Sequence, residues 1–126
     1  MSEVSSGANL SRKPMARSRW VAEQWPAFVV YFAELTTEEL ETAVIRHEEC
    51  VRLQSDELTK LLVGDDIALT DHASHMRTVG ANLLMLKGGL IPALKIDKDN
   101  QKIRQIAGQA MAFVKAEYDF MHNELL

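Results

Sequence analysis

The feature that most constrains this chain is an apolar stripe that recurs in four separate stretches, with alternating spacings of four and three residues. Residues at this spacing fall on one face of an α-helix. A stripe that keeps this period also favours helices that pack nearly parallel, with a slight left-handed supercoil. The sequence therefore predicts an all-α protein. The stripe positions are Val21, Trp25, Phe28, Phe32 and Leu35, then Leu40, Val44, His47, Val51, Gln54, Leu58 and Leu61, then His72, Met76, Val79, Leu83, Leu86, Leu90 and Ala93, and finally Ile103, Ile106, Ala110, Phe113, Val114, Glu117, Phe120 and Met121.

Four helices fit between the turn-forming residues of the chain. The connections between them are short, and short connections join antiparallel neighbours. We therefore expect an antiparallel up-and-down bundle of about four helices. The first helix should span about Arg19 to Leu35, the second should run from a cap at Thr36 to about Val63, the third from a cap at Thr70 or Asp71 to before Pro92, and the fourth from a cap at Asp97 or Asp99 nearly to the C-terminus.

Local signals mark both ends of the second helix. Thr36 and Glu39 have the spacing of a capping box, in which the side chain of each residue accepts the backbone N–H of the other. Gly64 supplies the left-handed residue that commonly follows a helix. The second helix is therefore the best delimited of the four.

Two segments leave more than one interpretation. The third helix should weaken at the glycine pair 88–89 and stop by Pro92, because the residue before a proline avoids helical angles. The segment 27–32 has β-propensity as well as the helical stripe, so a buried strand is the alternative to a helix there. The continuity of the stripe favours a helix.

Charge divides the chain into an arm and a body. The first 19 residues hold four cations against one acid, a net charge of +3, which leaves −7 for the rest of a chain whose total is −4. Residues 1–18 are rich in Ser, Gly and Arg and have little apolar surface to bury, which predicts a flexible basic arm. Residues 19–126 form the helical bundle domain. The four cations of the arm could bind phosphates, could bind an acidic protein surface, or could simply be solvated; they are Arg12, Lys13, Arg17 and Arg19.

The cysteine content and the apolar runs indicate where the protein works. Cys50 is the only cysteine, so no internal disulfide can form, which is typical of a reducing compartment. The first twenty residues lack the apolar region of a signal peptide. The longest apolar run, 27–33, is much shorter than the roughly 20 residues that cross a membrane. We expect a soluble protein that is cytoplasmic or otherwise intracellular, not secreted, and has no membrane partner.

Two polar residues, His47 and Gln54, interrupt the stripe of the second helix. A polar group at a core position of packed helices costs stability and can fix their register or oligomeric state. These two residues are therefore candidates for an interface between copies of the chain. The alternative is that the second helix is only half buried and both residues lie at its margin.

Small residues recur on the last two helices. Gly108, Ala112 and Ala116 are spaced by four, and Gly80 and Gly88 by eight. Such rows let two helix backbones approach closely. We expect the third and fourth helices to pack tightly through them, with an oligomer interface as the alternative.

One group of residues could hold a metal ion. His72 and His75 are three apart on the third helix, and Asp119 and His122 are three apart on the fourth. Antiparallel helices joined near residue 95 bring the two pairs to the same end of the bundle. Three histidines and a carboxylate suit Zn²⁺ or Fe²⁺. Against this, the Glu-x-x-His pairs of ferritin-like di-iron proteins are absent, and polar residues near helix ends are often simply solvated. We expect no other cofactor.

The chain has no nucleophilic triad and no glycine-rich phosphate loop, so we expect no catalytic residues and no enzymatic activity. The continuous stripes, the polar residues within them and the charge-segregated arm favour an interaction or assembly protein, such as a scaffold, an adaptor or a virion-type component. Its expected partner is another copy of itself, bound through a face of the first or second helix. The first alternative is a nucleic-acid accessory protein that binds through the arm. The second is a metal-binding helical protein that uses the histidine group.

Overall fold

The computed structural model describes residues 17–125, and its regular elements are all helical. The predicted all-α fold is therefore confirmed, and the segment 27–32 is helix rather than strand. Of the predicted arm, Arg17 and Ser18 already belong to the first helix, and residues 1–16 lie outside the described part. The elements are α1 (Arg17–Ala33), α2 (Thr37–Leu61), α3 (Asp66–Met85), the π-helical turn η1 (Leu86–Leu90), α4 (Ile91–Ile96) and α5 (Gln101–Leu125).

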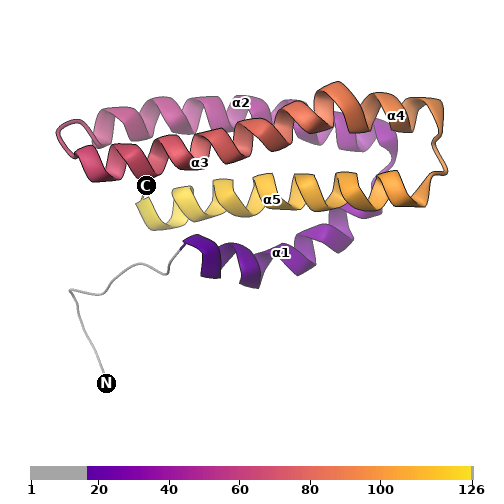
Figure 1. Ribbon diagram of the computed structural model, residues 1–126, viewed down its shortest axis with the longest axis horizontal. Coiled ribbons are helices and arrows are strands. Elements are labelled where there is room, and N and C mark those ends of the chain that lie inside the picture. Colours follow the sequence, from indigo (N-terminus) through magenta and orange to yellow (C-terminus); the bar gives the residue numbers. More distant parts are fainter. Residues whose placement is uncertain (1–16, 126) are drawn as a thin grey trace, which may run out of the picture.

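The elements form four rods, because α3, η1 and α4 follow one another without a break. Figure 1 shows α5 between α1 on one side and α2 with α3 on the other. α1 packs on α5 far more extensively than any other two elements pack on each other. The Trp20 indole N–H, near the start of α1, donates to the Ala116 carbonyl at 3.1 Å, whereas Ala33 at the end of α1 touches Gly108. The two helices are therefore antiparallel.

Most predicted stripe positions are buried or half-buried, but some fully buried side chains lie off the stripes, among them His75, Leu94 and Met111. Two stripe positions are exposed: Leu61 lies in the last turn of α2, and Ile106 faces a groove beside α1. The polar stripe residues Gln54, His72 and Glu117 are buried with the apolar ones. The largest fully buried apolar side chains are Leu40, Leu58, Leu86, Leu94, Met111 and Met121.

The predicted ends of α2 are confirmed. Glu39 N–H donates to Thr36 Oγ1 at 3.1 Å and Thr36 N–H donates to Glu39 Oε1 at 2.9 Å, which completes the capping box. Gly64 has φ of +92°, the left-handed conformation expected after the helix. At the other end of the chain, the expected cap at Asp97 or Asp99 is wrong, because the Asn100 side chain accepts from Ile103 N–H at 3.0 Å.

The third helix starts earlier and ends later than predicted. It begins at Asp66, not after Thr70 or Asp71, and it does not stop at Pro92. The π-helical turn accounts for the second difference, since Ile91 N–H bonds to the Leu86 carbonyl across a wider ring. Pro92 then falls in the first turn of α4, where a missing N–H leaves no helical bond unmade.

The predicted tight packing of the third helix on the fourth through small residues is wrong. A Cβ placed on Gly108 would lie 3.0–3.1 Å from the backbone and Cβ of Ala33, which belongs to α1. Placed on Gly80 or Gly88, it would meet nothing within 4 Å. The small residues of α5 therefore admit α1, whereas those of α3 and η1 face open space. The spacing revealed the close approach but could not identify the helix that makes it.

One arginine joins three separate segments. The Arg104 guanidinium donates to the Leu35 carbonyl, to the Lys98 carbonyl at 2.9 Å and to Thr37 Oγ1 at 3.4 Å. These bonds fix the α1–α2 turn and the start of α2 beside the start of α5. These bonds therefore help to fix how α1 is oriented relative to α2 and α5 at this end of the bundle.

Candidate interaction surface and buried polar cluster

A buried polar cluster connects α3, α5 and α1. The side chains of His75 and Glu117 are almost inaccessible, at 0% and 2% exposure, and His75 Nδ1 donates to Glu117 Oε1 at 2.7 Å. Arg17 Nε lies 3.4 Å from the same oxygen, and the arginine side chain is about one-third exposed. The carboxylate is thus held by two donors from different helices, which a buried charge requires.

His72 extends this cluster to α2. Its ring stacks on that of His75 at 6.3 Å between centroids, and its Nε2 lies 3.2 Å from Ser55 Oγ. Burial lowers the pKa of His72 below its usual value, and the neighbouring His75 acts in the same direction. His72 Nδ1 and His75 Nε2 are buried without a hydrogen-bond partner in the described part of the chain. The cluster therefore links all four rods, and two of its nitrogens remain uncommitted.

The expected metal group is only partly assembled. His72 and His75 lie together, but Asp119 Oδ1 binds Lys115 Nζ at 2.9 Å, and His122 stacks on the Tyr118 ring. Within residues 17–125, no three histidine, cysteine or acidic side chains are grouped as metal ligands. The Zn²⁺ or Fe²⁺ site remains a prediction.

Glu117, the acid that binds His75, is not one of the predicted site residues. Glu117 belongs to the stripe of α5, and an acid at a stripe position is the signal that could have identified it. A carboxylate in a core needs a donor, and the histidines of the third helix are the nearest candidates in an antiparallel arrangement. The stripe of α5 therefore points to Glu117 as the partner of His75, and not to Asp119, two residues further along the helix.

The two polar stripe residues of α2 each make a hydrogen bond within their own chain, and Gln54 Oε1 is buried without a partner among the described residues. The Gln54 side-chain amide, only 4% exposed, donates to the Tyr118 carbonyl at 2.9 Å. His47 Nδ1 donates to the Ala43 carbonyl at 2.9 Å, and its ring lies edge-on to Phe32 and Tyr118. Burial lowers the pKa of His47 below its usual value. Gln54 thus joins α2 to α5, and His47 fills the space between α2, α1 and α5. Their expected role at an interface between copies stays a prediction.

Two cations of the predicted arm lie in α1 and are paired. Arg17 reaches Glu117, as described above, and Arg19 Nε lies 3.2 Å from Glu23 Oε2. Arg12 and Lys13 lie outside the described residues. Half of the cations assigned to phosphate binding are thus engaged by acids of α1 and α5.

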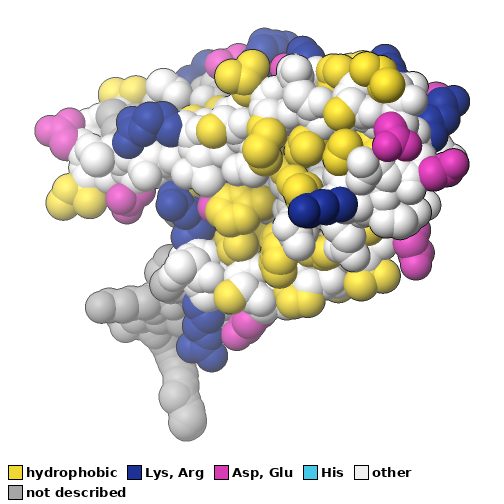
Figure 2. All heavy atoms as spheres, turned by 45° about the vertical axis from the view of Figure 1, so that its right-hand side comes forward, with side chains coloured by type: hydrophobic (Ala, Val, Ile, Leu, Met, Phe, Trp, Pro, Cys, Tyr) yellow, Lys and Arg dark blue, Asp and Glu magenta, His cyan; other side chains and the backbone are white. Residues whose placement is uncertain are grey.

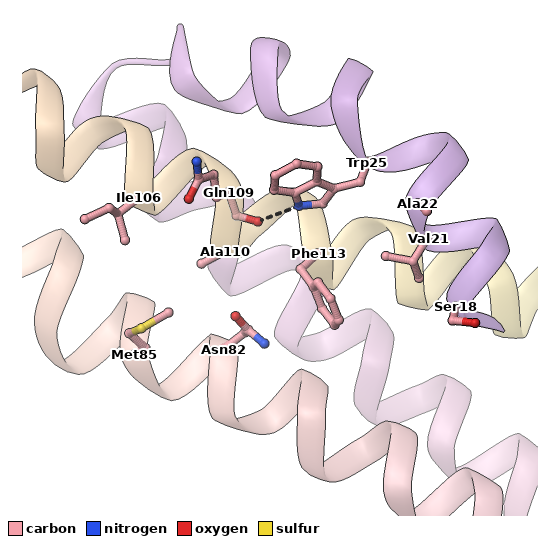
Figure 3. Close-up of a pocket in the computed structure, with 10 residues that line it drawn as sticks. All are labelled: Ser18, Val21, Ala22, Trp25, Asn82, Met85, Ile106, Gln109, Ala110 and Phe113. Carbon is pink, nitrogen blue, oxygen red and sulfur yellow. Dashed lines mark hydrogen bonds between the residues drawn. The ribbon is translucent and has the colours of Figure 1, made fainter.

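An uncharged groove runs between α1 and α3 above α5. This α1–α3 groove has a volume of about 440 Å³, and side chains from all three helices point into it (Figure 3). The Trp25 indole N–H donates to the Gln109 carbonyl at 3.2 Å and forms part of one wall. None of the ten lining side chains carries a charge. They are Ser18, Val21, Ala22, Trp25, Asn82, Met85, Ile106, Gln109, Ala110 and Phe113.

The outer face of α3 continues this uncharged surface. Between His72 and Leu86, only one of the exposed positions is charged, Arg77. Leu84 is 72% exposed and Met85, which also lines the groove, is 44% exposed. Figure 2 shows hydrophobic side chains gathered across the middle of one face of the molecule. We call the outer side of α3, apart from Arg77, together with the α1–α3 groove the uncharged face.

The rod formed by α3, η1 and α4 is also the most membrane-like part of the chain. The stretch Thr70–Ile96 has the length to cross a bilayer, and its most apolar window of 18 residues has a mean hydropathy of 1.3, yet only 28% of that window is buried within the protein. The window is not an uninterrupted apolar run, because Asn82, Lys87 and Lys95 break it up. Length and composition alone do not separate a membrane span from the core helix of a soluble protein.

A second and larger groove lies between α1 and α2. This α1–α2 groove has a volume of about 820 Å³ and a mixed lining. Aromatic side chains of α1 form one wall, and charged side chains of α2 and α5 lie around the rim. The lining residues are Ala27, Phe28, Tyr31, Phe32, Leu35, Glu38, Glu39, Thr42, Ala43, Arg46, His47 and Lys115.

Comparison of the chain with models of protein families, with curated proteins and with solved structures finds no match.

Proposed function

We propose that this protein is a non-catalytic helical assembly protein that associates with a second copy of itself through the uncharged face. The observation that carries the proposal is the mismatch on the α3–η1–α4 rod, which combines the hydropathy of a core helix with 28% burial. Exposed apolar surface that is contiguous and poor in charge is typical of interaction sites. Single exposed leucines, by contrast, are ordinary on protein surfaces.

The shape of the uncharged face suits two copies related by a two-fold axis. In such a dimer each copy presents the same patch, so a ridge on one copy must meet a groove on the other. Here the ridge is α3 with Leu84 at its crest, and the adjoining hollow is the α1–α3 groove. Gly80 and Gly88 leave open space beside the ridge, which allows a second backbone to approach closely.

A second copy suits this face better than a bilayer does. The inner side of the same rod carries His72 and His75, which bind side chains of α2 and α5. Lys87 Nζ is also paired with Glu48 Oε2 on α2 at 3.1 Å. Insertion of the rod in a membrane would separate these polar groups from their partners, at a cost of several kcal/mol each.

The test compares two exposed leucines by sedimentation velocity. Leu84 lies on the uncharged face, and Leu53, 55% exposed, lies on the outer side of the heavily charged α2. We expect the unmodified chain and Leu53→Glu to sediment as dimers and Leu84→Glu as a 14.2 kDa monomer, because a buried unpaired carboxylate opposes association. Equal behaviour of the two variants, or a monomeric unmodified chain, would contradict the proposal.

A flotation assay examines the bilayer as the competing partner. The unmodified chain is mixed with vesicles of phosphatidylcholine and phosphatidylglycerol and spun through a density gradient. We expect the protein to stay at the bottom. The opposite result has two parts: the unmodified chain is monomeric without vesicles, and it floats with them unless Leu84 is replaced by Glu. That result would show that the uncharged face binds membranes instead of a second copy.

A further inference from the structure

The α1–α2 groove joins an aromatic wall to a charged rim, and its contacts indicate what it can bind. Its volume of about 820 Å³ falls within the range of pockets that take small organic ligands, roughly 300–1,000 Å³. Phe28 and Leu35 are partly buried and Tyr31 is 60% exposed along the α1 side. This wall offers aromatic and aliphatic surface to an apolar body.

The charged side chains around the groove differ in their partners. Glu38 Oε2 lies 3.9 Å from Lys98 Nζ, and Glu39 Oε1 accepts the neutral Thr36 N–H at 2.9 Å. Arg46 has no carboxylate partner within the described part of the chain. The lining therefore carries two acids and two cations, and the Arg46 guanidinium is the cation left free to bind an anion.

A second cation reinforces this end of the groove. Lys115 Nζ binds Asp119 Oδ1 at 2.9 Å and also lies 5.9 Å from the centres of the Phe28 and Tyr118 rings. Its ammonium group therefore stands directly beside the aromatic surface. An anion that binds Arg46 would also be attracted by this neighbour.

We propose that the α1–α2 groove binds an amphipathic carboxylate, a molecule with an acyl or aryl body and a single carboxylate head. The head would pair with the Arg46 guanidinium, whose planar fork matches a carboxylate. The body would lie along Phe28, Phe32 and Leu35 and leave water.

Calorimetric titration of the full chain with decanoate, below its critical micelle concentration, tests this proposal. Decan-1-ol is the matched probe, because it has the same body without the charge. We expect one decanoate per chain, bound at least several-fold more tightly than decan-1-ol. Arg46→Gln should weaken decanoate binding about tenfold, the usual effect of one charge-assisted hydrogen bond. Lys60→Gln is the control, since Lys60 is also an exposed cation of α2, has no ion pair among the described residues and lines neither groove, and it should change nothing.

Three results would overturn the proposal: equal affinity for decanoate and decan-1-ol, unchanged affinity in Arg46→Gln, or amide shifts on titration that centre on Gln109 rather than on Ala43 and His47. The inference is independent of the proposed self-association, because Leu84 does not line this groove. Leu84→Glu should bind decanoate as the unmodified chain does. Sedimentation and decanoate binding can therefore refute one proposal and leave the other standing.

Discussion

Replacing Gly108 by alanine tests the packing of α1 on α5, and Gly80→Ala supplies the reference. Both glycines lie inside helices, so each substitution gains about 1 kcal/mol of helix propensity. The new Cβ at position 108 would lie 3.0–3.1 Å from three atoms of Ala33, two of them backbone, whereas the one at position 80 would meet nothing within 4 Å. Backbone atoms cannot turn away as a side chain can, so α1 has to shift.

The cost of such overpacking is typically about 1–3 kcal/mol. Gly80→Ala should therefore stabilise the protein by about 1 kcal/mol, and Gly108→Ala should be less stable than Gly80→Ala by about 1–3 kcal/mol. Because the propensity gain is common to both variants, their difference isolates the contact with α1. Urea unfolding followed by circular dichroism measures it. Equal midpoints for the two variants would refute the reasoning, since α1 would then not be seated on Gly108.

Two further predictions concern the buried histidines. His75→Leu and Glu117→Leu should each destabilise the protein by about 1–3 kcal/mol, because the first leaves the buried Glu117 carboxylate with Arg17 as its remaining donor and the second leaves the buried His75 Nδ1 without an acceptor. The double substitution should cost much less than the sum; strictly additive losses in urea unfolding would show that the two residues are not coupled. Burial lowers the pKa values of His47 and His72 in the folded protein below 6.5, their usual value. As the pH falls below 6.5, the unfolded chain therefore binds protons that the folded chain does not, and the free energy of unfolding should decrease. Unfolding midpoints measured from pH 8 to pH 5 should show this decline, with a shallower slope in His72→Gln; midpoints that rise on acidification would contradict it.

The features that the sequence predicted correctly are those with local causes. The stripes define the buried face of each rod, and the capping box of Thr36 with Glu39 and the left-handed Gly64 bound the second helix, because each of these depends on residues within a few positions. The same reasoning failed at Pro92. A proline ends a regular α-helix, but a π-helical turn at the glycine pair 88–89, where the helix was expected to weaken, changes the hydrogen-bond register just before the proline.

The contacts between rods were harder to predict. The small residue at position 108 indicated a close approach, but α1 rather than α3 makes it, since periodicity does not say which neighbour faces a stripe. For the same reason the expected partners of His75 were Asp119 and His122, two and five residues beyond the acid it binds. The two grooves depend on how α1 sits on α5, a tertiary feature that sequence spacing does not encode.

The most direct test of the assembly proposal is an isotope-filtered nuclear Overhauser experiment on an equal mixture of ¹³C-labelled and unlabelled chains. This experiment detects only contacts between copies. We predict contacts from the Leu84 and Met85 methyl groups of one copy to the Trp25 ring of the other. The absence of any contact between copies at millimolar concentration, or contacts confined to the charged outer side of α2, would contradict the account.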